Sequence, residues 1–273
     1  MPSIYAFPCP VGVNQTILQW HAYAVTAEYF DQWYIDIAAS EARQRLFTHW
    51  LDLPPEIGPS NLVPFSGLHE IADALAVPEN GLLIDVACGR GGPGMWIARR
   101  AQARLIGVDF SPEAVAQASK RRSLFGLESH ATFQVGSLEA PGLTENSADA
   151  VMCIDAFQFA ADGTESASRL RQLLRPGGRI VLTSWEAKDR DDESVPERLR
   201  RADLSASLAG AGFREVTKRE REDWHTVTLQ LWEHAVTLDP AGDPAIESTQ
   251  AEAVRSIEIH DRVRRVVATA VAP

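Results

Sequence analysis

Residues 81–94 read GLLIDVACGRGGPG, and this stretch decides how the rest of the chain is interpreted. Its first half is a short apolar run, which is typical of a strand buried on both faces of a parallel sheet. The run ends at Cys88–Gly92, where glycines allow positive φ and let the backbone approach a ligand closely. Pro93 then suits the first turn of a helix. The stretch predicts a strand, a glycine turn and a helix N-terminus, whose unpaired N–H groups point at a polar ligand.

A second apolar run, Leu105–Val108, ends in Asp109. A carboxylate at the tip of a second strand can accept hydrogen bonds from both ribose hydroxyls of a nucleoside, so we expect an adenosine-containing cofactor. The spacing of Gly89, Gly91 and Gly94 is G-x-G-x-x-G, which also suits a nicotinamide dinucleotide. Asp85 favours a different cofactor, because a carboxylate just before the turn repels a pyrophosphate. It suits a cationic ligand that carries an ammonium group and a sulfonium.

Three motifs together resemble those of class I S-adenosylmethionine-dependent methyltransferases. IDVACGRGGPG and the later GVDFSPEAV are similar to the first two motifs of that family, and LLRPGGRIVL is similar to the turn before its fifth strand. The resemblance extends from Gly81 to Trp185. It implies S-adenosylmethionine as cofactor and methyl transfer to an O, N or C nucleophile of a small, apolar or aromatic metabolite, as in the natural-product branch of the family. One departure is Ala87, where the family usually has glycine. An NAD-dependent oxidoreductase and a non-catalytic S-adenosylmethionine-binding protein are the alternatives.

Composition and charge narrow the possible partners and location. The chain has 273 residues and a net charge of −11, which argues against a nucleic-acid substrate. No apolar run approaches the roughly 20 residues that span a membrane, and the first residues lack the pattern of a signal peptide. The three cysteines have no paired spacing, which suits a reducing compartment and no metal site. We therefore expect a cytoplasmic enzyme with a small-molecule acceptor, and a homodimer stays open.

The predicted architecture is a doubly wound, Rossmann-like α/β sheet of about seven strands, the last of them antiparallel, with an N-terminal helical cap. Residues 1–65 are interpreted as an arm and helical lid, and residues 66–273 as the S-adenosylmethionine-binding domain. Residues 224–260 are predicted to be a helical insertion before the last strand. The patterns further predict helix over 16–48, one helix over 196–211, and a fifth strand over 179–184 with Trp185 at its tip.

The resemblance also implies which residues contact the cofactor. Family members carry a lid tyrosine near the cofactor, for which Tyr29 is the nearest match, and an acidic residue at the position of Ser137. Phe110 is a candidate to lie against the adenine. The full set of cofactor candidates is Tyr29, Asp85, Ala87, Gly89, Gly91, Asp109, Phe110, Gly136, Ser137, Leu138 and Asp155.

The acceptor is expected beyond the fourth strand, because open α/β sheets bind ligands outside the carboxyl ends of their strands. Many small-molecule members have histidine where Gln158 or Phe159 stands, so the usual general base is missing. His21 on the lid and Asp155 at the strand tip are the candidate catalytic residues. Candidates for acceptor contacts are Tyr23, Phe157, Gln158, Phe159 and Trp185.

Overall fold

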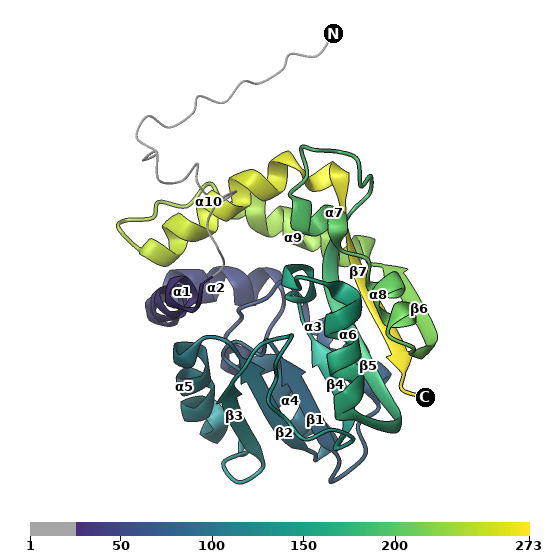
Figure 1. Ribbon diagram of the computed structural model, residues 1–273. Coiled ribbons are helices and arrows are strands. Elements are labelled where there is room, and N and C mark those ends of the chain that lie inside the picture. Colours follow the sequence, from purple (N-terminus) through teal and green to yellow (C-terminus); the bar gives the residue numbers. More distant parts are fainter. Residues whose placement is uncertain (1–25) are drawn as a thin grey trace.

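The computed structural model describes residues 26–273, and its centre is a seven-stranded sheet (Figure 1). The strand order is β3-β2-β1-β4-β5-β7-β6. Five strands are parallel, whereas β7 lies antiparallel between β5 and β6. The strands are β1 Leu82–Val86, β2 Arg104–Asp109, β3 Ala131–Val135, β4 Ala148–Cys153, β5 Leu174–Ala187, β6 Arg214–Glu220 and β7 Val263–Val271. The predicted doubly wound fold with an antiparallel last strand is confirmed.

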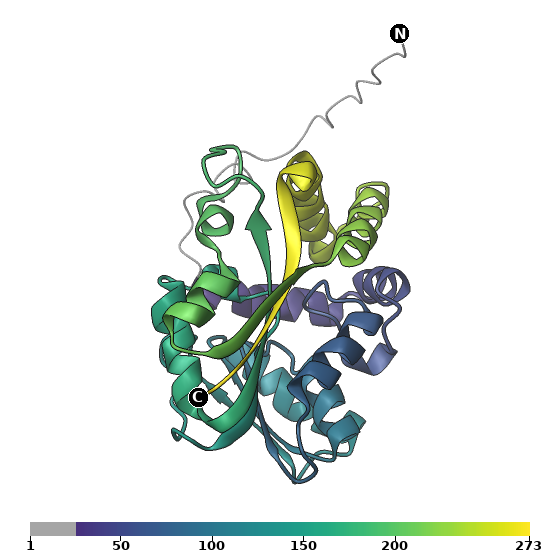
Figure 2. The same cartoon turned by 90° about the vertical axis from the view of Figure 1, so that its right-hand side faces the viewer.

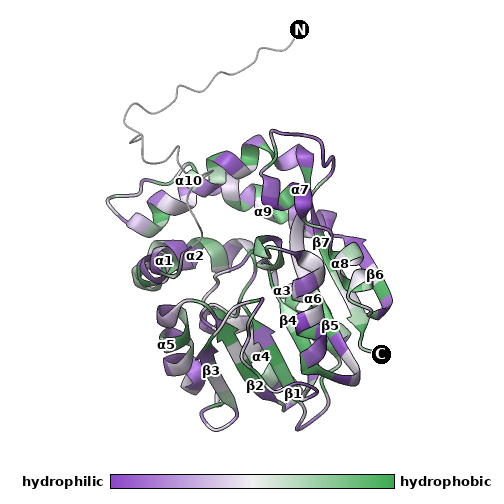
Figure 3. Cartoon of the chain, viewed as in Figure 1, coloured by the Kyte–Doolittle hydropathy of each residue, from purple (hydrophilic) through white to green (hydrophobic). Residues whose placement is uncertain are grey.

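The central strands are buried on both faces, as their apolar runs predict. In β1, Leu83 packs into one core cluster, whereas Leu82 and Ile84 pack into a second cluster on the other face. This alternation follows from the period of two of an extended chain. Figure 3 shows the central strands β1, β2 and β4 as mainly hydrophobic. The glycine turn after β1 is therefore fixed on a strand that has no solvent-exposed face.

Helices cover both faces of the sheet. One core cluster draws on α3, α4 and α9, and the other draws on α6 and α8. The α-helices are α1 Ala27–Ala39, α2 Glu41–Trp50, α3 Phe65–Leu75, α4 Gly92–Ala101, α5 Pro112–Arg121, α6 Gly163–Leu173, α7 Glu197–Arg201, α8 Leu204–Gly210, α9 Glu222–Ala235 and α10 Pro244–Glu258. Short 3-10 helices are η2 Pro55–Ile57, η3 Arg122–Phe125, η4 Phe157–Phe159 and η5 His260–Arg262.

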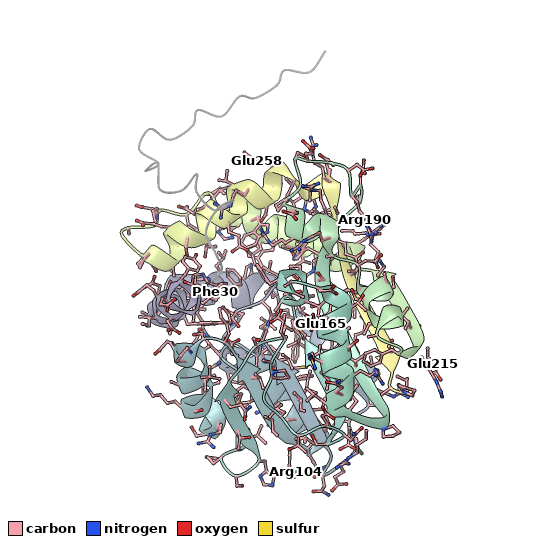
Figure 4. The ribbon with its side chains drawn as sticks, in the orientation of Figure 1. Phe30, Arg104, Glu165, Arg190, Glu215 and Glu258 are labelled. Atoms are coloured by element: carbon pink, nitrogen blue, oxygen red, sulfur yellow. The ribbon has the colours of Figure 1, made fainter. Side chains whose placement is uncertain are left out.

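A helical cap stands over the carboxyl ends of the parallel strands. Figure 4 places Phe30 of α1 on the cap side of the sheet and Arg104, the first residue of β2, at the opposite edge. Figure 2 shows α9 and α10 beside each other above α2. Arg43 of α2 donates from Nε to Thr249 Oγ1 of α10 at 3.2 Å, and Ser40 Oγ donates to Asp243 Oδ2 at 2.5 Å. Segments from both halves of the chain therefore form one cap, and the division at residue 65 stays a prediction.

Three expected elements differ from those in the structure. Residues 16–25 of the helix expected over 16–48 lie outside the described residues, and its described part is interrupted at Ser40, whose side chain caps α2 by accepting from the Arg43 N–H. The helix expected over 196–211 is interrupted before Asp203, which caps α8 in the same way. The fifth strand extends to Ala187 because β7 pairs with it over that whole length, so Trp185 lies inside the strand and not at its tip. In residues 26–273, no helix is both long and apolar enough to cross a membrane.

Candidate functional site

The glycine turn after β1 has the left-handed backbone that its sequence predicts. Gly89 and Gly91 have φ of 53° and 73°. Ala87 also adopts a positive φ of 57°, which explains why related sequences favour glycine at this position. A Cβ on Gly94 would lie 2.5 Å from Asp85 Oδ2, so the first turn of α4 packs directly against that carboxylate. The turn therefore brings backbone N–H groups and Asp85 to one place.

Asp109 ties the second strand to this turn. Its Oδ2 accepts the Gly89 N–H at 2.8 Å, and its Oδ1 accepts the Ser111 N–H at 3.0 Å. Burial raises the pKa of Asp109, while these backbone hydrogen bonds lower it. Each carboxylate oxygen has more than one lone pair, so Asp109 keeps acceptor capacity for a ligand hydroxyl.

Asp85 is buried beside Asp109 and differs from it in its partners. Burial and the Asp109 charge raise the pKa of Asp85 well above its usual value. Among the described residues, none donates a hydrogen bond to its carboxylate. A buried carboxylate without donors is costly unless a cation pairs with it. The ammonium group of S-adenosylmethionine has the required charge, so this residue fits the cofactor that the motifs imply.

The Arg121 side chain stabilises the glycine turn, a role that the sequence does not predict. Its Nη1 donates to the Arg90 carbonyl at 2.7 Å, and its Nη2 donates to the Glu56 carbonyl at 2.6 Å. Burial lowers the pKa of Arg121 to about 10. Arg121 thus joins the glycine turn to the connector that contains η2, and a Cβ on Gly92 would lie 1.8 Å from the Ile57 carbonyl oxygen.

Tyr34 is the lid tyrosine that faces the glycine turn. A Cβ on Gly89 would lie 2.9 Å from Tyr34 Oη. Burial and the charges of Asp109 and Asp85 raise the pKa of this phenol. The resemblance implies Tyr29, the nearest match to the family pattern, and both tyrosines lie on α1.

The charges that act on Tyr29 come from α10 and from its own helix. Burial and the Glu252 carboxylate raise its pKa to about 12, and Arg255 lowers it. Its ring packs edge-on against Phe30 at 5.4 Å, and Phe30 packs against Phe110 at 5.2 Å. The cofactor contact of Tyr29 stays a prediction. Phe110 lies where the lid meets the tip of β2.

Residues at the end of β3 complete this side of the site. The Gly136 N–H donates to the Asp109 carbonyl at 3.0 Å, which places Gly136 beside β2. Ser137 Oγ accepts the Ala140 N–H at 3.1 Å and so stabilises its own turn. Leu138 is buried in the core. The cofactor contacts of these three residues stay predictions.

Asp155, after β4, already has four hydrogen-bond interactions with its carboxylate. Arg265 Nη2 donates to both of its oxygens at 2.9 Å and 3.0 Å. The Leu62 N–H and Thr183 Oγ1 donate at 2.9 Å and 2.7 Å. Arg265 is fully buried, and its guanidinium lies 4.7 Å from the centre of the Trp185 ring. This arrangement favours a role for Asp155 in holding the strand tip over a role as general base.

The acceptor candidates after β4 fall into different environments. Phe157 is buried in the core, and Gln158 is held by a bond from its Nε2 to the Asp155 carbonyl at 2.8 Å. Phe159 is 41% exposed, and the guanidinium of Arg198 lies 5.4 Å from the centre of its ring. Of these residues, Phe159 has the most surface available for a ligand. His21 and Tyr23 lie outside the described residues.

Within residues 26–273, no group of three or more His, Cys, Asp or Glu side chains is placed to hold a metal ion. The residues that the structure does bring together are the carboxylates and backbone groups at the ends of β1, β2 and β3. They are Asp85, Ala87, Gly89, Gly91, Asp109, Phe110 and Gly136.

Comparison with known proteins agrees with this geometry. Residues 84–182 match the family model described as "Methyltransferase domain". The chain is 30% identical to the sterol 24-C-methyltransferase of Kluyveromyces lactis over 129 residues, which are 47% of this chain and 35% of that protein. The chain thus spans about a third of the length of that relative. The family resemblance inferred from the motifs is confirmed.

Solved structures share the fold. The [4+2]-cyclase SpnF superposes with a TM-score of 0.64 at 20% identity, over 76% of this chain and 79% of the other. The geranyl diphosphate C-methyltransferase of Streptomyces coelicolor A3(2), solved with Mg²⁺, geranyl-S-thiolodiphosphate and S-adenosyl-L-homocysteine, gives a TM-score of 0.62 at 17% identity, over 77% of each chain. At these identities the likeness establishes the fold alone.

Proposed function

We propose that this chain, whose residues 84–182 match the family model described as "Methyltransferase domain", binds S-adenosylmethionine and transfers its methyl group to a small molecule. One observation carries the choice of cofactor. Asp85 is a buried carboxylate at the glycine turn, and no described residue donates a hydrogen bond to it. Its charge suits an ammonium group and opposes a pyrophosphate.

Each part of the turn has a role in this proposal. Asp109 accepts hydrogen bonds from the ribose hydroxyls, and Asp85 pairs with the ammonium group. The N–H groups before α4 bind polar groups of the ligand. Tyr34 covers the turn from the lid and excludes water. When bound, the cofactor supplies a sulfonium, whose methyl group is already activated toward a nucleophile.

The acceptor is proposed to lie between the tip of β4 and the cap. Phe159 offers an exposed aromatic face there, and Arg198 stands over it. Holding the nucleophile in line with the methyl group inside a closed site supplies much of the acceleration, because the reaction then needs little further loss of translational freedom. An apolar or aromatic acceptor with a polar substituent suits these neighbours.

The cellular setting is part of the same proposal. Cys88 and Cys153 are both buried and free, which suits a reducing compartment such as the cytoplasm. The net charge of −11 disfavours nucleic acid as a partner.

Size-exclusion chromatography with light scattering would decide between a monomer and the homodimer that the sequence leaves open.

Two measurements test the function against its alternatives. Isothermal titration calorimetry with S-adenosylhomocysteine and with NAD separates a methyltransferase from an oxidoreductase. Mass spectrometry of a metabolite extract incubated with protein and methyl-deuterated S-adenosylmethionine then separates an enzyme from a non-catalytic binder. A product that gains the label supports the proposal. Binding of S-adenosylhomocysteine without any labelled product favours the non-catalytic alternative.

A further inference from the structure

Helix α1 packs in a small core cluster that is separate from the main core. Its buried residues Tyr34 and Ile37 form this cluster with one alanine from α5 and one from α10. The neighbouring helix α2 instead contributes Leu46 and Phe47 to the large core cluster that contains the sheet. A helix with few buried contacts opens at a lower free-energy cost than a helix anchored in the main core. Of these two helices, α1 therefore moves away from the sheet more readily.

The chain changes direction at Ser40, between α1 and α2. Ser40 has an extended backbone, with φ of −89° and ψ of 103°, and its hydroxyl donates to Asp243 Oδ2 at 2.5 Å. Beyond it, α2 is fixed by Arg43, which is only 4% exposed. Arg43 Nη1 donates to the Pro59 carbonyl at 3.0 Å, and its Nε donates to Thr249 Oγ1 at 3.2 Å. A rotation about the Ser40 backbone would therefore move α1 and leave α2 in place.

Asp31 joins α1 to the first turn of α5. Its Oδ1 accepts the Ser111 hydroxyl and also the Glu113 N–H, the latter at 3.1 Å. N–H groups in the first turn of a helix have no partner within that helix, so a carboxylate from another element stabilises this end of α5. Nearly one turn further along α1, the Tyr34 carbonyl accepts Gln117 Nε2 of α5 at 3.1 Å. We call the two bonds of Asp31 the α1 latch.

The α1 latch shares Ser111 with the proposed ribose site. Asp109 Oδ1 accepts the Ser111 N–H at 3.0 Å, while the Ser111 hydroxyl donates to Asp31. Burial raises the pKa of Asp109, and the nearby Asp31 charge raises it further. The carboxylate proposed to bind the ribose and the carboxylate that holds α1 are therefore both bonded to one serine.

The proposed cofactor residues are covered in this structure. Asp85 and Asp109 are each only 2% exposed, and Gly89 is buried. The Tyr34 phenol of α1 lies against Gly89, where an added Cβ would be 2.9 Å from its Oη. A nucleoside cofactor must contact these groups directly, so an element that covers them has to move before it binds. Because α1 lies outside the main core, it is the covering element that moves with the least loss of packing.

We propose that Asp31 is a positioning residue that holds α1 closed over the cofactor site, and that the α1 latch breaks each time the cofactor enters or leaves. This inference rests on the proposed S-adenosylmethionine-binding function. With the latch formed, Tyr34 stands over the glycine turn and Phe30 packs against Phe110 at 5.2 Å. With the latch broken, α1 turns about Ser40 and uncovers the turn. The latch therefore slows both entry and exit of the ligand.

The first test follows binding of S-adenosylhomocysteine to full-length Asp31→Asn by stopped-flow tryptophan fluorescence. The amide keeps the shape of the side chain but is a weaker acceptor for the two donors of α5. We expect the association and dissociation rate constants both to rise about tenfold, with a much smaller change in Kd, because the free and the bound chain both open more often. Damage to the binding site would raise the dissociation rate constant alone. An association rate constant equal to that of the wild-type chain would overturn the proposal.

Asp36→Asn is the matched control for this experiment. Asp36 lies on the same helix, and its Oδ1 accepts Gln32 Nε2 of that helix at 2.8 Å. The control therefore removes one negative charge from α1 without changing the α1 latch. We expect wild-type rate constants in this variant. A rise as large as that in Asp31→Asn would show that the charge of α1, and not the bonds of Asp31, controls entry, and would overturn the proposal.

Hydrogen exchange of the wild-type chain identifies the moving unit without any substitution. We expect the amides of α1 to exchange faster than those of α2, and S-adenosylhomocysteine to slow exchange in α1 much more than in α2. Bound ligand that protects both helices equally, or neither of them, would overturn the proposal. Failure of the wild-type chain to bind S-adenosylhomocysteine at all would instead refute the proposed function.

Discussion

The phenol of Tyr34 stands over Gly89, so close that a Cβ on that glycine would lie 2.9 Å from the tyrosine Oη. Tyr34 comes from α1 of the cap, whereas Gly89 follows β1 at the centre of the sheet. The cap therefore packs so closely against the glycine turn that no space is left for a methyl group on Gly89. Ligand binding at the turn and the position of α1 must be coupled.

Replacing Gly89 with alanine is predicted to weaken cofactor binding at least tenfold. The new Cβ would meet Tyr34 Oη and also Ser60 Oγ, both at 2.9 Å, in a backbone of positive φ. Gly177→Ala is the matched control, since Gly177 has a φ of 78° and nothing within 4 Å of an added Cβ. Calorimetry with S-adenosylhomocysteine should find the affinity reduced in the first variant alone. Equal affinity in both would show that the turn is not where the cofactor binds.

Asp109→Asn is predicted to lower the affinity for S-adenosylhomocysteine by roughly 30-fold, which corresponds to about 2 kcal/mol for the loss of a charged acceptor. The amide can still accept one hydrogen bond, so the variant should fold. Asp73→Asn removes an exposed carboxylate paired with Arg100 at 2.8 Å and should leave binding unchanged. Wild-type affinity in Asp109→Asn would remove Asp109 from the ribose site.

Asp85→Asn is predicted to change stability and binding in opposite directions. The folded chain raises the pKa of Asp85, so it holds a proton that the unfolded chain releases as pH rises above the ordinary aspartate value. Stability of the ligand-free protein therefore falls as pH rises through that window, and the neutral amide relieves this cost at pH 7. Relief of about 1 kcal/mol would raise Tm by roughly 2–4 °C. Without ligand, thermal unfolding should show a higher Tm for Asp85→Asn than for the wild-type chain. Adding S-adenosylmethionine should raise the Tm of the variant by less than it raises that of the wild type.

Two stacked histidines give a separate dependence of stability on pH. The rings of His225 and His260 are 3.6 Å apart and nearly parallel, at 14°. Burial and the neighbouring His260 lower the pKa of His225 to about 4, and burial lowers that of His260. The unfolded chain binds protons first as pH falls, so stability is lost between about 6.5 and about 4. Because His225 is only half-buried, we expect a loss of about 1–2 kcal/mol after allowing for solvent screening.

Urea unfolding at pH 7.5 and at pH 5 measures this loss. His260→Phe keeps a ring against His225 and removes one titrating group, so its stability should change less between the two pH values. An unchanged pH dependence in that variant would place the origin elsewhere in the chain.

The positions of the strands along the chain and the turn after β1 were predictable from the sequence because each depends on local signals. Apolar runs identify strands such as Leu82–Val86, and glycines mark the turn. Interruptions at Ser40 and Asp203 were missed. Both side chains cap the following helix by accepting from an N–H three residues later, so a local signal was present, although their contacts with Asp243 and Lys218 depend on tertiary packing.

Within the site, the sequence predicted only those residues that lie at the ends of strands. Asp85 and Asp109 lie at the ends of strands and are brought together by the sheet register. Arg121, Tyr34 and Arg265 reach the site from helices and from β7, so their roles depend on tertiary packing. Gln158 and Asp155 illustrate the same limit, because their neighbours Ser184 and Arg265 decide which of their atoms remain free.

Calorimetric titration of the purified full-length chain with S-adenosylhomocysteine and, separately, with NAD tests most directly whether Asp85 and the glycine turn form a site for a cationic cofactor. We predict one saturable site for S-adenosylhomocysteine, with affinity in the micromolar range, about −8 kcal/mol, and no heat of binding for NAD. Saturable binding of NAD in the absence of any binding of S-adenosylhomocysteine would contradict the assignment.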